Sequence, residues 1–206
     1  IDFSSRRPAR SFGVLATLLL MAVLAVLLAA MPAHAQSNEP ISIGRDDTAL
    51  DLTGAVTIYR DRGNAFRVST APDAEGIVRT IEVQASNADT AGDWAVLVLT
   101  NTSDVQLDRL LVAPRFRLVS SGLFWPDLGA QRIVALTPSS GFSLDRIDDP
   151  HADIFAITLD PGAVITLVAE LASPTLPQLY LWEEDAYKDI VNSYTLYHGI
   201  VLGIAG

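Results

Sequence analysis

Two stretches of the chain decide its fold: Trp94-Ala-Val-Leu-Val-Leu-Thr100 and Ile165-Thr-Leu-Val-Ala-Glu-Leu171. Successive side chains of an extended chain point to opposite faces, so alternate positions of each stretch can face a common core. Each stretch is therefore predicted to be a strand that is buried on the inner face of a sheet.

The pattern around these two stretches repeats along most of the chain. Between Ile41 and Trp182, short apolar runs with alternation are separated by clusters of Gly, Pro, Asn and Asp, which is typical of all-β proteins. The predicted strands are Ala49–Leu52, Val56–Arg60, Phe66–Val68, Val78–Val83, Trp94–Asn101, Arg109–Leu118, Ile133–Leu136, Ile154–Leu159, Val164–Leu171 and Gln178–Trp182.

So many short strands predict a mainly β fold, an antiparallel β-sandwich that is jelly-roll-like, over residues 41–182. Asp160-Pro161-Gly162 is predicted to be a hairpin or tight turn, which would pair Ile154–Leu159 with Val164–Leu171.

The N-terminal segment has a different composition. Arg6, Arg7 and Arg10 precede an almost wholly apolar run from Phe12 to Ala30, and Ala33-His34-Ala35 follows as a small-residue cleavage site. Residues 1–35 are therefore predicted to be a secretory signal helix. Because the apolar run approaches the length of a membrane span, the rival prediction is an uncleaved anchor.

A helical pattern begins after Trp182. Glu183, Glu184 and Asp185 provide acidic side chains for a first turn, where they favour the helix dipole. From Tyr194 to Gly206 the chain carries no formal charge. Residues 183–206 are predicted to be a junction helix and the start of a first transmembrane helix, in a chain that continues past Gly206. The alternative is a soluble helix that caps the sandwich.

Charge and cysteine content exclude several classes of partner and cofactor. Without the acidic Asp2 and the three arginines of the signal segment, residues 36–206 carry 11 basic and 23 acidic side chains, a net charge of −12. Binding to nucleic acid is disfavoured, because it needs a clustered basic surface and Lys188 is the only lysine. The absence of cysteine excludes thiolate-bound zinc and iron–sulfur clusters, and no cofactor is predicted.

Catalytic motifs are missing as well. The chain has no Gly-x-Ser-x-Gly, His-Glu-x-x-His or Gly-x-x-x-x-Gly-Lys sequence, so no catalytic residue and no enzymatic activity are predicted. Asp148, Asp149 and Asp153, around His151, have the oxygen ligands that a hard cation prefers. The required loop pattern is absent, which favours a solvated turn over a metal site.

Aromatic residues are the other candidates for a binding site. Phe124 and Trp125 lie in a predicted loop, where an exposed aromatic pair is more notable than in a strand, and they are the predicted ligand-binding residues. Trp94 opens an apolar strand and is predicted to belong to the core. Trp182 stands between the last strand and the helix and is predicted to pack at that junction.

Several segments resemble the extracellular domain of the bacterial seven-transmembrane receptors with diverse intracellular signalling modules. They are Asp47-Thr-Ala-Leu-Asp-Leu-Thr53, Val56-Thr-Ile-Tyr-Arg-Asp61, Gly92-Asp-Trp-Ala-Val-Leu-Val-Leu-Thr-Asn101, Gln178-Leu-Tyr-Leu-Trp-Glu-Glu-Asp-Ala-Tyr-Lys188 and Tyr194-Thr-Leu-Tyr-His-Gly-Ile-Val-Leu-Gly203. The resemblance implies a periplasmic jelly-roll domain that binds a carbohydrate or another small ligand. It also implies a cytoplasmic output such as a diguanylate cyclase, a phosphodiesterase or a histidine kinase. The resemblance does not identify which residues of this chain bind the ligand.

The sequence thus predicts an extracytoplasmic sensor domain, held at the inner membrane with its β-domain in the periplasm. Its expected partners are a small-molecule or carbohydrate ligand, the inner membrane and, in a homodimer, a second copy. The alternative is a secreted or membrane-anchored envelope protein that binds or hydrolyses carbohydrate.

Overall fold

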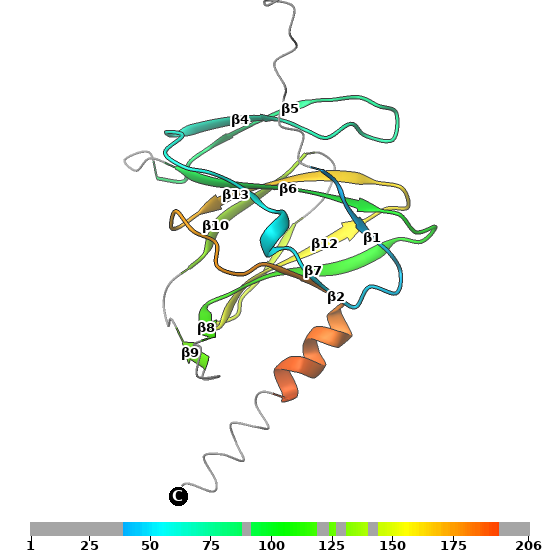
Figure 1. The fold of residues 1–206 in the computed structure, drawn as a ribbon, viewed down its shortest axis with the longest axis vertical. Helices are drawn as coiled ribbons and strands as arrows, with labels where there is room; N and C mark the ends of the chain where they lie inside the picture. Colours follow the sequence, from blue (N-terminus) through cyan, green and yellow to red (C-terminus); the bar gives the residue numbers. More distant parts are fainter. Residues whose placement is uncertain (1–38, 88–91, 119–123, 127–130, 140–143, 194–206) are drawn as a thin grey trace, which may run out of the picture. The chain divides into compact units, whose positions relative to one another are not determined.

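The structure is a computed structural model that describes residues 39–87, 92–118, 124–126, 131–139 and 144–193 (Figure 1). The predicted signal helix, residues 1–35, lies outside these residues, and so do residues 194–206, where the membrane helix is expected. Within the described ranges, no helix has the length and apolar character that crossing a membrane requires.

Two five-stranded sheets form the centre of the fold. The first, sheet A, contains β1 (Ile41–Ile43), β3 (Thr57–Tyr59), β6 (Asp93–Asn101), β13 (Val164–Leu171) and β10 (Ile133–Pro138). The second, sheet B, contains β11 (Asp145–Ile147), β12 (Ala152–Leu159), β7 (Leu107–Pro114), β14 (Tyr180–Trp182) and β2 (Ala49–Asp51). All pairs in these sheets are antiparallel except β1 with β6, so the prediction of a mainly β fold with antiparallel sheets is confirmed.

The inner faces of the two sheets share one hydrophobic core. Leu97 and Leu167 of sheet A belong to the same buried cluster as Leu111 and Ile157 of sheet B. Along the chain the central strands alternate between the sheets, from β6 to β7 and from β12 through β13 to β14. Burial of these apolar side chains is the main force that holds the sheets together.

The outer face of sheet A is also covered. A hairpin of β4 (Ala65–Ser69) and β5 (Thr80–Gln84) lies against β6 and β13 (Figure 1). Its Phe66 stacks on Trp94 with ring centroids 5.6 Å apart, which confirms Trp94 as a core residue. β6 is therefore buried on both faces, although the sequence predicts burial on the inner face alone.

The outer face of sheet B packs against the segment that follows β14. A helix runs over residues 184–193, called the junction helix below (Figure 1). Its Tyr187 and the preceding Trp182 pack on Val112 and Ile154 of sheet B. Glu183 N donates a hydrogen bond of 2.8 Å to Thr48 O, which fixes the start of the helix beside β2.

The predicted tight turn at Asp160-Pro161-Gly162 is confirmed, because Ala163 N donates to Asp160 O at 3.0 Å. The predicted pairing of the two flanking strands in a hairpin is wrong. β12 pairs with β7 along its whole length and β13 pairs with β6, so the turn crosses from sheet B to sheet A. Gly162 has φ 71°, in the left-handed region that glycine adopts without strain. The Asn101 amide nitrogen holds the corner by donating to Leu159 O at 2.9 Å and Asp160 O at 3.1 Å.

One predicted strand is divided into two in the structure. The sequence predicts one strand over Arg109–Leu118, but β7 ends at Pro114 and a separate strand β8 (Phe116–Leu118) begins after Arg115. Proline has no N–H for a ladder hydrogen bond, which is consistent with the break at that point. β8 pairs with β9 (Phe124–Pro126) in a two-stranded ribbon. η1 (Thr53–Ala55), a short 3-10 helix, completes the list of elements.

Candidate functional site

A buried carboxylate lies where the two sheets meet, at the start of β12. Asp153 belongs to sheet B, and its side chain has no exposed surface. Its Oδ2 accepts hydrogen bonds from the backbone nitrogens of Arg132, at 2.6 Å, and Ile133, at 3.0 Å, where β10 of sheet A begins. Asp153 therefore joins sheet B to sheet A through hydrogen bonds to a charged acceptor, which are stronger than those between neutral groups.

Two guanidinium groups bind the other oxygen of the same carboxylate. Arg115 Nη2 lies 2.6 Å and Arg146 Nη2 lies 2.8 Å from Asp153 Oδ1. Arg115 follows the last residue of β7, and Arg146 is the central residue of β11. A shared carboxylate offsets the repulsion that would otherwise separate two adjacent cations.

Further contacts fix the orientation of both arginines. Arg146 Nη1 donates to Val134 O at 3.1 Å, and its Cζ lies 5.4 Å from the centroid of the Phe155 ring. The backbone nitrogen of Arg115 donates to His151 O at 2.7 Å. The Arg115 side chain keeps 20% of its surface exposed and that of Arg146 keeps 34%, so both side chains are partly exposed.

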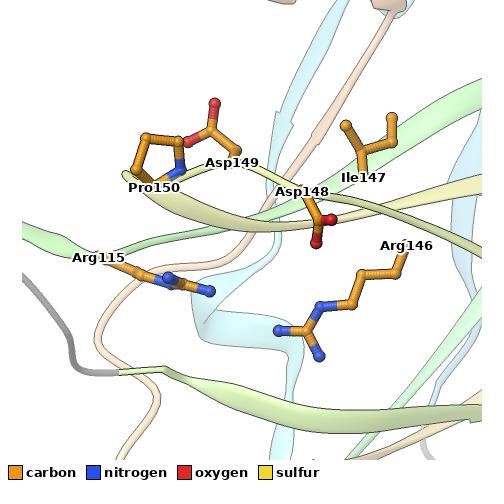
Figure 2. A pocket seen from close by; sticks show the side chains of 6 residues that line it. All are labelled: Arg115, Arg146, Ile147, Asp148, Asp149 and Pro150. Atoms are coloured by element: carbon orange, nitrogen blue, oxygen red, sulfur yellow. The ribbon is translucent and has the colours of Figure 1, made fainter.

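These exposed parts line an open cleft of about 390 Å³. Its walls are Arg115, Arg146, Ile147, Asp148, Asp149 and Pro150. In Figure 2 the two guanidinium groups point toward one another, the Asp148 carboxylate points toward the Arg146 guanidinium group, and the Asp149 carboxylate points away. The cleft thus presents hydrogen-bond donors and a charged acceptor to the same space.

The junction helix lies near Asp148, Asp149 and Pro150, called the rim of the cleft below. Burial, and secondly the negative charge of Asp149, raise the pKa of Tyr187 to about 12. Tyr187 also packs with Ala152 and Ile154, which follow the rim in sequence. The loop of residues 148–151 is therefore close to both the cleft and the helix.

The raised pKa of Tyr187 predicts a titration that absorbance can measure. Its neutral phenol stabilises the native state fully below pH 10.0, where a solvent-exposed tyrosine titrates, and this contribution is lost as pH rises through about 12. We expect Tyr187→Phe to remove a tyrosine that titrates near pH 12 from the ultraviolet absorbance curve of the folded protein. Loss of a tyrosine that titrates near pH 10.0 would contradict the burial of Tyr187 against sheet B.

The predicted aromatic site is only partly located. Phe124 and Trp125 lie in the paired strand β9, so the prediction that they occupy a loop is wrong: their backbone pairs with Leu118 and Arg117 of β8. The ribbon starts directly after Arg115. The side chains of both residues lie outside what the structure describes, so their role in ligand binding stays a prediction.

The three aspartates near His151 do not act together. Asp148 is exposed, so the prediction of a solvated turn is right for this residue. It is wrong for Asp153, which is buried and bound by two arginines. Among the described residues no group of acidic and histidine side chains could hold a metal ion. Trp182, the last residue of β14, packs against Tyr187 at the junction of strand and helix, as predicted, and the centroids of the two rings are 6.4 Å apart.

The family of the chain follows from a comparison with family models. The model described as 7TMR-DISM extracellular 2 matches residues 53–183, more than half of the chain. This chain belongs to that family. No curated protein and no solved structure matches it.

The 7TMR-DISM extracellular 2 match covers every residue that lines the cleft and ends just before the junction helix. It is a family of extracellular sensor domains of seven-transmembrane receptors, and it is not a family of enzymes. The cleft is therefore part of the domain that such receptors place outside the cytoplasm.

Proposed function

We propose that this chain is the periplasmic sensor domain of an inner-membrane receptor, and that it signals to a cytoplasmic output domain. The family match over residues 53–183 carries this proposal. In keeping with it, the proposed output is a diguanylate cyclase, a phosphodiesterase or a histidine kinase. The ligand is a small molecule or a carbohydrate. Residues 1–35 direct export, and a first membrane helix begins near Tyr194.

We further propose a jelly-roll topology for the domain. The orders β11-β12-β7-β14-β2 in sheet B and β1-β6-β13-β10 in sheet A support it, because most strands of these sheets that are consecutive in the chain lie in opposite sheets. β11 and β12, which pair in sheet B, are an exception. Jelly rolls are double-sheet folds of this kind.

The junction helix is the proposed route of the signal. Trp182 and Tyr187 pack on sheet B, and Tyr187 lies near Asp149 at the rim of the cleft. A ligand shifts the receptor only to the extent that it binds two arrangements of rim and helix with different affinities. The packing of Tyr187 on Ala152 and Ile154, which follow the rim in sequence, gives such a difference a physical basis.

A flexible insertion tests this route. We expect Gly-Ser-Gly-Ser between Glu183 and Glu184 of the full-length receptor to abolish the ligand-dependent change in output activity, because movement of the rim would no longer reach the membrane helix. The matched control places the same insertion at the exposed turn beside Gly76, which should preserve the response. An unchanged response with the junction insertion would refute the route.

A further inference from the structure

We propose that the cleft binds a small zwitterion with a carboxylate and an ammonium group, the chemistry of a free α-amino acid. This inference rests on the proposed sensory function and names the class of its ligand. The combination of two fixed guanidinium groups and one carboxylate in the same cleft carries it.

The guanidinium groups form the side of the cleft that would bind the ligand carboxylate. Both are held by Asp153 Oδ1, and Arg146 is further oriented by Val134 O and the Phe155 ring. Within the described part of the chain, the side chain of Arg115 donates one hydrogen bond and that of Arg146 donates two. A guanidinium presents more N–H groups than these bonds use, in a planar fork that matches a carboxylate.

Asp148 forms the side that would bind the ligand ammonium group. It is exposed, and its carboxylate points into the cleft toward the Arg146 guanidinium group in Figure 2. Asp153 is unsuited to this role, because its two oxygens already accept four hydrogen bonds and it has no exposed surface. Asp148 is therefore the acceptor that the cleft offers to a cationic group.

The balance of charges favours a ligand that carries both signs. A simple anion would meet the arginines but also Asp148, and a simple cation would meet Asp148 but also both arginines. Like charges at close range disfavour wrong partners, so a dipolar ligand with its carboxylate toward the arginines gains both attractions and avoids both repulsions.

The walls of the cleft disfavour a neutral sugar. Among its described lining residues there is no aromatic ring, which is the flat surface on which a sugar would stack; the apolar walls are Ile147 and Pro150. A volume of about 390 Å³ is at the lower end of small-molecule sites, which suits a ligand of amino-acid size.

Binding measurements on the 206-residue chain test the proposal. The probes are the standard L-amino acids, measured by thermal unfolding and then by calorimetry. Each amino acid that binds is compared with its amide, which lacks the carboxylate, and its 2-hydroxy acid, which lacks the ammonium group; D-glucose is the neutral probe. We expect at least one amino acid to bind, and both analogues to bind at least about tenfold more weakly, since each loses a charge-assisted hydrogen bond.

Two variants show whether the binding occurs in this cleft. Asp148→Asn should lower the affinity for the amino acid at least about tenfold, because it removes the charged acceptor. Asp148 is exposed, so the substitution leaves the buried contacts of Asp153 unchanged. Asp145→Asn is the matched control, since Asp145 is an exposed carboxylate of β11 that does not line the cleft. It should bind as the unchanged chain does.

Several results would overturn the ligand class. They are binding by none of the amino acids, equal binding of an analogue, binding of glucose alone, or unchanged binding by Asp148→Asn. None of these would remove the receptor function, because membrane placement and the junction insertion test that function without knowledge of the cleft.

Discussion

Replacing Asp153 with alanine is expected to lower the free energy of unfolding by about 3–5 kcal/mol. The substitution would leave two guanidinium groups adjacent without their shared counter-charge, and two backbone N–H groups at the start of β10 without an acceptor. Both losses fall at the junction of the two sheets, where the side chain has no exposed surface. Urea unfolding, followed by far-ultraviolet circular dichroism, measures the change.

An exposed ion pair is the matched control for Asp153. Arg67 and Glu82 are 2.7 Å apart on the β4–β5 hairpin, but their side chains are 68% and 52% exposed. Glu82→Ala should therefore cost no more than about 1 kcal/mol. If Asp153→Ala cost as little as Glu82→Ala, Asp153 would not be the buried link between the sheets.

Replacing Asn101 with alanine is expected to lower the free energy of unfolding by about 2–3 kcal/mol. Asn101 is buried, and its amide nitrogen donates to Leu159 O, Asp160 O and Val105 O. Its Oδ1 accepts from the backbone nitrogen and the hydroxyl of Ser103. Alanine would leave the buried Leu159 carbonyl without this donor at the corner where β12 leads into β13.

Thr158→Ala is the control for Asn101. The Thr158 hydroxyl donates to Asp108 Oδ1 at 2.7 Å in an exposed position, where water can replace the lost partner. It should cost no more than about 1 kcal/mol in the same urea titration. Equal losses for the two variants would show that Asn101 does not brace the corner.

The sequence locates the long central strands because their signal is local, but it misses the three-residue strands β1, β9 and β11. Alternation and apolar content locate β6, β12 and β13 closely. The partners of a strand depend on distant residues, which explains the wrong hairpin at Asp160-Pro161-Gly162. Its turn residues predict a reversal of the chain, but they do not say whether the next strand joins the same sheet. The choice depends on the matching partners β7 and β6 and on the Asn101 side chain.

The candidate site is harder to predict from the sequence than the central strands are. Closeness in sequence groups Asp153 with Asp148 and Asp149, but the structure separates them: Asp153 faces the interior at the end of a buried strand, and Asp148 faces solvent. Arg115 and Arg146 carry no motif, and only the pairing of β7 and β11 with β12 brings them to one carboxylate. A signal is nevertheless present, since an aspartate beside the apolar run from Ile154 requires a buried partner.

The placement of the β-domain in the periplasm, attached to the inner membrane, is the central claim and can be measured directly. The chain has no cysteine, and Asp104 is exposed in the loop between β6 and β7, so Asp104→Cys gives a single labelling site in this domain. Spheroplasts that express the full-length gene product are treated with a membrane-impermeant maleimide before lysis and fractionation, with the unsubstituted protein as the control for other thiols. The account predicts labelling before lysis and recovery of the labelled protein in the inner-membrane fraction; labelling only after lysis, or release of the protein in soluble form, would contradict it.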